Sequence, residues 1–271
     1  MIVFPNCKIN LGLNIISKRN DGYHDIETIF YPVALNDILE VIPAPDEIFE
    51  FHFSGLFIPG EADKNLCFRA YQLLQAEFKL PAVKMHLHKV IPMGAGLGGG
   101  SSDGAFTLKL LNDLFNIGLN KEQLENYARM LGSDCAFFIE NQPCFAYEKG
   151  DQFIHIPVDL SGLTLVMVNP DVHVNTADAY NAITPAMPDQ SIKDLILMPV
   201  SQWKDNLVND FEKPVFEKYP VIREIKSSLS KMGAIYTAMS GSGSTVYSLF
   251  KEIPALENQF SEYFVWVSAR L

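Results

Sequence analysis

Apolar residues occupy every second position from Ile9 to Ile15, with Lys8, Asn10 and Asn14 among the residues between and beside them. This period of two predicts a strand over residues 7–16, because successive side chains of a strand point to opposite faces. The polar positions are equally consistent with a face turned to solvent and with a face that carries function.

A turn follows this strand, with the sequence Arg19-Asn-Asp-Gly-Tyr-His24. Asn, Asp and Gly favour tight turns, so we expect a hairpin whose second strand covers residues 26–33. The aromatic pair Tyr23 and His24 stands at the start of this strand, where a packing role and a binding role both remain open. Residues 36–60 are predicted to form further strands.

Helical spacing first appears after residue 65. The pattern predicts a helix over residues 65–78, a strand around residues 83–88 and a second helix that includes Ala105 and Leu108. The strand is linked to the second helix by Lys89–Asp103, where five glycines fall in positions 94–100 and two serines follow.

This glycine-rich link is predicted to bind phosphate. Glycine lets the backbone approach an anion closely, and a helix start contributes unpaired N–H groups and the positive end of the helix dipole. Gly94, Gly96 and Gly99 match the dinucleotide-binding spacing, but that spacing alone is a weak signal, and another helix pattern follows where a βαβ unit needs a strand. No Gly-Lys-Ser/Thr follows the glycines, which excludes a P-loop, while a flexible turn without a ligand stays open.

A third helix is predicted to begin at the cap residue Asn120 and to stop at Leu131–Asp134. Asp134 precedes a strongly apolar segment, where an acidic side chain either caps the following turn or has a function. The pattern loosens around residues 150–162, which predicts a boundary between two domains, residues 1–155 and 156–271.

The second half of the chain mixes strands and helices, which indicates an α+β arrangement. A proline-rich connection is expected over residues 184–201, and a glycine-rich turn at Met239–Thr245. The predicted strands cover residues 163–168, 234–239, 246–250 and 265–268, and the predicted helices follow Asn209–Glu212 and cover residues 221–232 and 254–264.

Composition narrows the class of protein. Hydrophobic residues make up 48% of the chain and charged residues 20%, as in ordinary globular proteins. The net charge of −11 argues against a nucleic-acid or anionic-membrane partner, and it requires local donors for any polyphosphate ligand. The four cysteines form no CxxC pair, so we expect reduced, mostly buried thiols in a cytoplasmic protein. No signal peptide and no stretch of about 18 apolar residues is visible.

Several motifs together resemble the GHMP kinases, the superfamily of galactokinase, homoserine kinase, mevalonate kinase and phosphomevalonate kinase. Pro92–Ser102 is similar to their glycine-rich second motif, and Met239–Thr245 is similar to their third. Lys8–Leu11, Arg19–His24 and Leu131–Asp134 are similar to elements of those members whose substrate carries a cytidine diphosphate, and Arg19–His24 is the most specific of the three. The likeness runs along nearly the full chain.

The resemblance implies an α+β fold of two domains. The N-terminal domain would be an α/β domain like domain 2 of ribosomal protein S5, the C-terminal domain would be a ferredoxin-like α+β domain, and the active site would lie in the cleft between them. The implied activity is the direct transfer of the γ-phosphoryl group of ATP to a hydroxyl group of a small molecule, which requires positioning, charge neutralisation and a proton acceptor.

The resemblance also implies roles for individual residues. Asp134 would accept the proton, and Lys8 would hold Asp134 ionised and stabilise charge on the oxygens. Asn10 would orient the substrate or the base. The residues implied to bind the substrate are Tyr23 and His24 at the cytidine, Tyr180 as a second aromatic that closes a sandwich around the ring, and Asp171, His173 and Thr176 in the same pocket. The residues implied to bind ATP are Asn65, Leu66 and Lys89 at the base or ribose, and Pro92, Gly94, Gly96, Gly98, Gly99, Gly100, Ser101, Ser102, Gly241, Ser242 and Gly243 around the phosphates.

The chain departs from the family pattern at three places: Asn6-Cys7 before the lysine, Asp103 after the serines, and Ser244-Thr245 after the glycine turn. No Glu follows the serines closely, so Mg²⁺ is expected to be bound mainly by ATP and water. Another GHMP kinase, acting on mevalonate, homoserine or galactose, and a non-catalytic nucleotide-binding module stay open as alternatives. We expect a monomer or a weak homodimer.

Overall fold

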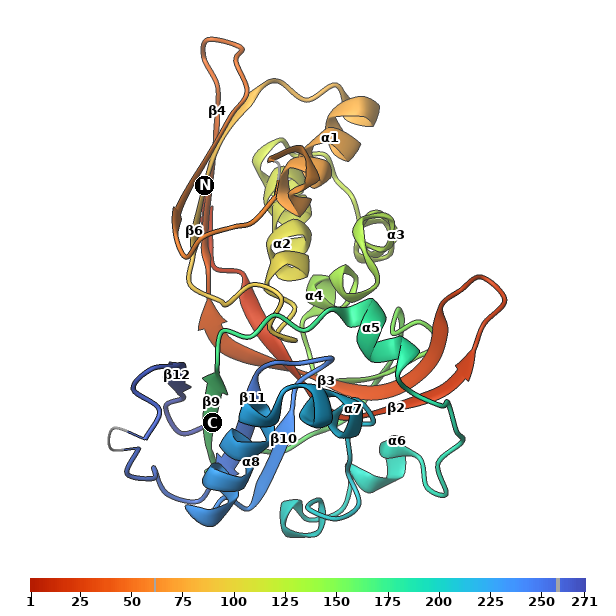
Figure 1. Ribbon diagram of the computed structural model, residues 1–271. Coiled ribbons are helices and arrows are strands. Elements are labelled where there is room, and N and C mark those ends of the chain that lie inside the picture. The colour runs from red at the N-terminus through yellow and green to blue at the C-terminus, as the bar shows by residue number, and fades with distance from the viewer. Residues whose placement is uncertain (61, 257–258) are drawn as a thin grey trace. The chain divides into compact units, whose positions relative to one another are not determined.

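The computed structural model describes residues 1–60, 62–256 and 259–271 (Figure 1). The chain forms two units whose segments interleave along the sequence. Unit 1 comprises Met1–Lys8, Pro32–Met93 and Gly98–Gln142, and unit 2 comprises Ile9–Tyr31, Gly94–Leu97 and Pro143–Leu271. Because the segments interleave, the division into domains 1–155 and 156–271 stays a prediction.

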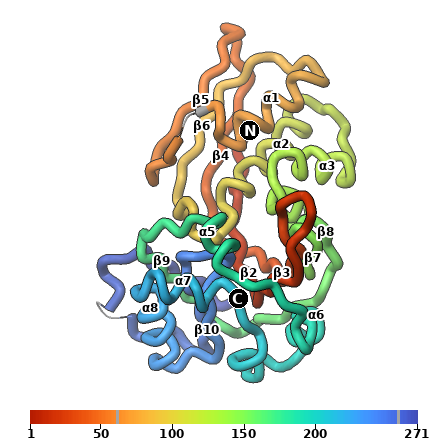
Figure 2. Tube along the Cα trace, turned by 45° about the vertical axis from the view of Figure 1, so that its right-hand side comes forward, coloured from red at the N-terminus to blue at the C-terminus, as the bar shows by residue number. Residues whose placement is uncertain are grey.

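Unit 1 is a sheet covered by helices. The strand order is β1-β4-β6-β5, and β6 is antiparallel to β4 and parallel to β5. Every second residue of β6 is buried, and the helices lie together on one side of the sheet (Figures 1 and 2). The elements are β1 (Ile2–Val3), β4 (Ile38–Pro43), β5 (Glu50–Gly55), η1 (Ala62–Lys64), α1 (Leu66–Phe78), β6 (Val83–Lys89), α2 (Gly99–Leu114), α3 (Lys121–Leu131), η2 (Ser133–Cys135) and α4 (Phe137–Glu140).

Unit 2 contains an antiparallel sheet of order β10-β11-β9-β12. Helix α8 presents Ile222, Ile225 and Leu229 to this sheet and shares a buried cluster with Val166 and Val246. The elements are β9 (Thr164–Asn169), α5 (Thr176–Asn181), α6 (Ile192–Leu195), η3 (Val200–Gln202), α7 (Glu212–Lys218), α8 (Pro220–Lys231), β10 (Tyr236–Met239), β11 (Val246–Phe250) and β12 (Phe264–Val267).

A third sheet has the order β2-β3-β7-β8, with β2 at Asn6–Lys18, β3 at His24–Asn36, β7 at Cys144–Tyr147 and β8 at Gln152–His155. The hairpin predicted between β2 and β3 is confirmed, and the backbone N–H of Arg19 donates to the carbonyl of Tyr23 at 2.8 Å. The polar positions of β2 do not face solvent, because Lys8, Asn10 and Asn14 are 3%, 2% and 6% exposed. That burial favours the alternative in which this face carries function.

Most other predicted elements are also confirmed, including the capping box of Asn120 and Gln123 at the start of α3. The four cysteines are free and buried, as predicted. None of the described helices is long and apolar enough to cross a membrane.

The helix predicted over residues 254–264 is wrong for the described residues of that span. Residues 254–256 are irregular, residues 259–263 form turns and a bend, and Phe264 begins β12, while residues 257 and 258 lie outside the described part. Phe260 is buried in the core cluster of unit 2, and Leu256 and Tyr263 pack against it. The apolar spacing therefore reflects tertiary packing of a loop, which helical periodicity alone does not distinguish from a helix.

Candidate active site

The predicted strand, glycine loop and helix are present as β6, residues 90–98 and α2. Gly98 is the N-cap of α2, with φ of +69°, and no side chain caps the helix. The first N–H groups of a helix have no intrahelical partner, and together with the helix dipole they favour an anion. The N-terminus of α2 therefore has the features of a phosphate site.

Lys8 and Asp134 form an ion pair within unit 1, with 3.4 Å between Lys8 Nζ and Asp134 Oδ2. Asp134 lies in η2, and the helix that follows, α4, has Ala136 as its N-cap and no side-chain cap, so Asp134 does not cap that helix. The Lys8 side chain passes close to the N-cap of α2, because a β-carbon at Gly98 would lie 3.1 Å from Lys8 Cε. An acid, a cation and a helix N-terminus therefore lie close together.

A cavity of about 310 Å³ lies beside the same helix in unit 1. It brings together Asn65, Leu66 and Gly100, all three of which the sequence predicted as ATP-binding residues. The Oδ1 atom of Asn65 also caps α1 by accepting from the N–H of Cys67 at 2.9 Å. The remaining lining residues are Phe53, Ile58, Pro59, Gly60, Lys64, Met93 and Asp103.

The predicted role of Lys89 at the base or ribose requires a correction, because its side chain has no exposed area. Its ammonium group donates to Asp37 and, at 2.7 Å, to Asp103 Oδ2, so it does not line the base or the ribose. Burial alone would lower the pKa of Lys89, but the two carboxylates outweigh it and raise that pKa, so the side chain stays charged. No pattern in the sequence pointed to Asp37, which lies 52 residues from Lys89.

The two serines of the loop differ in burial. Ser101 is half-buried, whereas Ser102 is fully buried and its Oγ has no hydrogen-bond partner in the described part of the chain. Of the two hydroxyl groups, that of Ser101 is therefore the more accessible.

Three aromatic residues predicted to bind the substrate lie in unit 2. His24 stacks on Tyr180 with ring centroids 4.8 Å apart and an interplanar angle of 19°, and Tyr180 in turn meets the edge of Phe211. Tyr23 is 58% exposed, with Lys149 Nζ 5.3 Å from its ring centre. An exposed ring next to a stacked pair suits a planar heterocycle.

The protonation of His24 follows from its surroundings. Burial lowers the pKa of His24, and the charge of Lys18 lowers it further. A neutral imidazole offers one hydrogen-bond donor and one acceptor, as a base edge requires.

The predicted glycine turn near the C-terminus lies beside the tip of the first glycine loop, within unit 2. Ser240 Oγ donates to the carbonyl of Gly96 at 2.8 Å, and a β-carbon at Gly96 would lie only 2.0 Å from the Ser240 carbonyl oxygen. A β-carbon at Gly94 would lie 3.0 Å from His173 Nδ1. Only glycine fits at such close approaches.

The same turn also reaches the predicted substrate residues. Thr176 Oγ1 and Ser242 Oγ are 3.1 Å apart, and Gly241 and Gly243 both adopt positive φ. The backbone N–H of Asp171 donates to Asn169 Oδ1 at 2.9 Å, and the side chain of Asp171 is exposed.

Several residues that support the turn were not predicted. Asn209 Nδ2 donates to the carbonyls of Met239 and Gly241, each at 2.8 Å, and Glu212 accepts from the N–H of Met239. Asn10 is buried, with Nδ2 donating to Thr28 Oγ1 and its backbone N–H donating to Ser240 Oγ. Asn10 therefore supports the turn. The polar run Asn209–Glu212 before α7 was visible in the sequence, but its partners were not.

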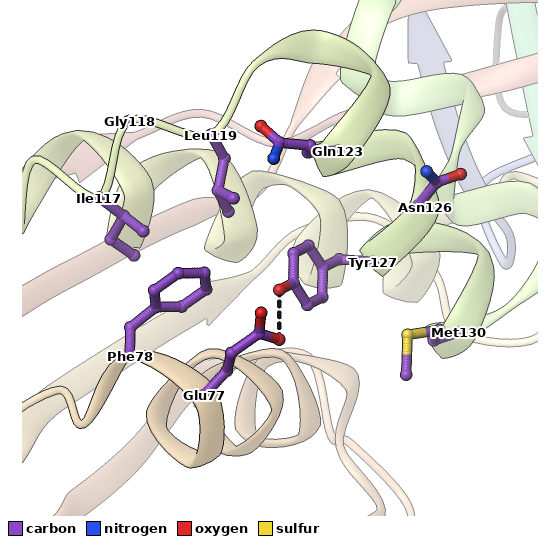
Figure 3. A pocket seen from close by; sticks show the side chains of 9 residues that line it. All are labelled: Glu77, Phe78, Ile117, Gly118, Leu119, Gln123, Asn126, Tyr127 and Met130. Carbon is purple, nitrogen blue, oxygen red and sulfur yellow. Dashed lines mark hydrogen bonds between the residues drawn. The ribbon is translucent and has the colours of Figure 1, made fainter.

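Two larger cavities contain none of the predicted site residues. One, of about 490 Å³, lies between α1 and α3, where the hydroxyl of Tyr127 donates to Glu77 near Phe78 and Leu119 (Figure 3). The other, of about 780 Å³, lies in unit 2 beside Asn209 and Phe216. The smaller cavity beside α2 is the better nucleotide candidate, because it adjoins a helix N-terminus suited to phosphate.

Comparisons with known proteins agree with this geometry. Residues 65–148 match the model of the GHMP kinases N terminal domain, and residues 193–265 match the model of the GHMP kinases C terminal domain. A mevalonate kinase from Methanococcus jannaschii has the same fold, with a TM-score of 0.73 at 14% identity over 98% of this chain and 97% of that chain. Fold and family models together define a GHMP kinase.

Relatives with higher sequence identity assign the chain to one family within the GHMP kinases. The chain is 57% identical over 252 residues, 92% of each chain, to a 4-diphosphocytidyl-2-C-methyl-D-erythritol kinase of Bacteroides fragilis, and 53% identical over 255 residues, 94% of each, to that of Cytophaga hutchinsonii. A crystal structure of 4-(cytidine 5'-diphospho)-2C-methyl-D-erythritol kinase superposes with a TM-score of 0.78 at 32% identity, covering 92% of this chain and 90% of that one. The chain therefore belongs to the 4-diphosphocytidyl-2-C-methyl-D-erythritol kinases, a family of ATP-dependent GHMP kinases.

Proposed function

We propose that this chain transfers the γ-phosphoryl group of ATP to the 2-hydroxyl of 4-diphosphocytidyl-2-C-methyl-D-erythritol, giving the 2-phosphate and ADP. This reaction belongs to the non-mevalonate route to isoprenoid precursors. The observation that carries the proposal is the Lys8–Asp134 pair at the N-terminus of α2, in a chain that is 57% identical over 252 residues to a kinase of that name.

Asp134 is the proton acceptor in this proposal. Its carboxylate takes the proton of the 2-hydroxyl, the oxygen bonds to the γ-phosphorus, and the bond from that phosphorus to the β-bridging oxygen breaks to release ADP. Lys8 stabilises negative charge that develops on the transferred group.

The phosphates of ATP lie at the N-terminus of α2, with Gly98–Ser101 around them, and the nucleoside occupies the 310 Å³ cavity lined by Asn65 and Leu66. In the described residues no group of three or more His, Cys, Asp or Glu side chains is placed to hold a metal. Mg²⁺ would be held mainly by the ATP phosphates and water, and would supply positive charge there.

The cytidine of the substrate is assigned to the aromatic residues of unit 2. Tyr23 stacks on the base, His24 hydrogen-bonds to the base edge, and Tyr180 holds the His24 ring in place by stacking on it. The sandwich predicted between Tyr23 and Tyr180 stays part of the proposal, with Asp171, His173 and Thr176 in the same pocket.

Replacing Tyr23 distinguishes this substrate from those of other GHMP kinases. Stacking of a base on an aromatic ring contributes about 1–3 kcal/mol, so Tyr23→Ala should raise KM for the cytidyl substrate about 10-fold and leave KM for ATP within about 2-fold. Tyr23→Phe keeps the ring and is the control, with both constants near those of the wild type. Steady-state kinetics that show no change in Tyr23→Ala, together with turnover of mevalonate, homoserine or galactose, would assign the chain to another GHMP reaction.

A further inference from the structure

A buried ionic cluster in unit 1, which we call the buried triad, consists of Lys89, Asp37 and Asp103. Their side chains are 0%, 0% and 4% exposed. Lys89 Nζ donates to both carboxylates, and Asp103 Oδ1 has no hydrogen-bond partner in the described residues. The catalytic steps proposed above use none of these three groups.

The triad connects three parts of the chain. Asp37 lies between β3 and β4, Lys89 ends β6, and Asp103 lies near the start of α2. The Oδ1 atom of Asp37 also accepts from the backbone N–H groups of Val90, at 2.6 Å, and Ile91, at 2.9 Å. One carboxylate therefore holds the first residues of the glycine loop, and through Lys89 it is connected to the helix that ends the loop.

The triad lies directly against the phosphate site. A β-carbon at Gly99, the first residue of α2, would lie 3.0 Å from Lys89 Nζ and 2.9 Å from Ile91 Cγ2. Asp103 also lines the cavity assigned to the nucleoside. The Lys89 ammonium group therefore lies close to Gly99, whose N–H belongs to the phosphate site, and leaves no room for a side chain there.

Stability alone is a weak explanation for such a cluster. Removing three ionisable groups from water is costly, and buried ion pairs are often no more stabilising than apolar side chains of similar volume. The unpartnered Asp103 Oδ1 adds to that cost. What the triad does provide is a fixed geometry at both ends of the loop.

We propose that the buried triad positions the glycine loop, holding its first residues and the start of α2 in the arrangement that binds the phosphates of ATP. This inference rests on the proposed function. Asp37, Lys89 and Asp103 are positioning residues in it, because they act through the backbone of the loop.

The test measures binding of the non-hydrolysable analogue AMP-PNP with Mg²⁺ by calorimetry. Asp37→Ala removes the acceptor for two loop N–H groups without altering the lining of the nucleoside cavity, and should raise Kd at least about 10-fold. At saturating ATP, kcat should stay within about 3-fold of the wild type, and KM for the cytidyl substrate within about 2-fold. The control is Leu74→Ala in the fully buried core of α1, which lowers the unfolding temperature and should leave Kd unchanged.

A second pair of variants keeps the test decisive if Asp37→Ala does not fold. Lys89→Met removes the donor to both carboxylates without altering the lining of the nucleoside cavity and should raise Kd about 10-fold, whereas Asp37→Asn keeps an acceptor for the two loop N–H groups and should stay within about 3-fold. Equal Kd values for the wild type and these variants, or an equal rise in Leu74→Ala, would overturn the inference alone. A wild type that binds no AMP-PNP would overturn the proposed function and the inference with it.

Discussion

The side chain of Asp134 is 38% exposed, whereas the side chain of its partner Lys8 is 4% exposed. This difference in accessibility fits the different roles proposed for them. A proton acceptor must reach the substrate hydroxyl, which the accessible carboxylate can do. The buried Lys8 side chain is instead proposed to stabilise negative charge on the transferred group. The motif likeness pointed to both residues, but only the structure shows which of them is accessible.

Replacing Asp134 by Asn tests its role as the proton acceptor. The amide has nearly the same size but accepts no proton at neutral pH, so kcat should fall at least ~10²-fold while KM for ATP changes little. Glu140→Gln makes the same chemical change on a nearby surface residue paired with Lys121, and should leave kcat unchanged. An undiminished kcat in Asp134→Asn would remove Asp134 from the mechanism.

The charge of Asp103 should make stability depend on pH. Burial raises the pKa of Asp103 to about 7, Lys89 opposes that shift, and Asp37 adds to it. The pKa of an unfolded Asp is about 3.9, so the folded protein binds more protons between about pH 4 and pH 7, and this group's contribution to stability falls as pH rises through that window. The titratable groups that face Asp103 are Lys89, Asp37 and Cys67.

Asp103→Asn removes this contribution. The variant should therefore gain stability relative to the wild type as pH rises from about 5 to about 8, as measured by thermal unfolding followed by circular dichroism. Comparing the two proteins at each pH cancels the titration of groups that do not interact with Asp103. A difference in unfolding temperature that stays constant with pH would contradict the raised pKa of Asp103.

Lys89 shows why part of the site could not be predicted from the sequence. The motif likeness implied a ligand contact for Lys89, and the glycine loop beside it was placed correctly. Whether a lysine faces a ligand or is buried depends on its partners, and Asp37 is brought to it by the pairing of β4 with β6. That pairing joins segments far apart in the sequence, so the local pattern of residues does not predict it.

At the scale of elements, the glycines of the glycine loop differ in backbone conformation and in the space around them. Gly98 adopts φ of +69°, and a β-carbon there would lie 3.1 Å from Lys8 Cε and 3.2 Å from Phe138 Cζ. Gly100 lies inside α2, and nothing is within 4 Å of its β-carbon position. Backbone conformation and available space therefore restrict which residue can stand at position 98, but not at position 100.

Alanine substitutions at these two positions should have opposite effects on stability. Gly98→Ala should lower the free energy of unfolding by about 1–2 kcal/mol because of its positive φ. Gly100→Ala should raise it by about 0.5–1 kcal/mol, since alanine favours a helix over glycine. Urea unfolding measures both, and a change of the same sign in the two variants would contradict the loop geometry described here.

Periodicity predicted most elements well, and its failure at residues 254–264 has a physical cause. Strand alternation in β2 and β6 and the caps of α1 and α3 depend on neighbouring residues, which the sequence shows directly. The apolar residues before β12 instead pack into the core of unit 2, and such long-range packing produces the same spacing without a helix.

At the scale of the whole molecule, the chain must bind polyanions while carrying a net charge of −11. The answer is local: a helix N-terminus without a capping side chain, a lysine at its start and backbone N–H groups of glycine turns. The two-domain α+β class came from the motif likeness. The interleaving of the two units could not be predicted, because it depends on which distant segments pair.

The central claim is tested most directly by the product itself. Purified protein is mixed with ATP, Mg²⁺ and 4-diphosphocytidyl-2-C-methyl-D-erythritol, and the products are analysed by mass spectrometry, with Asp134→Asn in a parallel reaction. We expect the substrate to gain the mass of one phosphoryl group in step with ADP formation, and the variant to form almost none. ADP without that gain in mass, or no ADP at all, would contradict the proposed reaction.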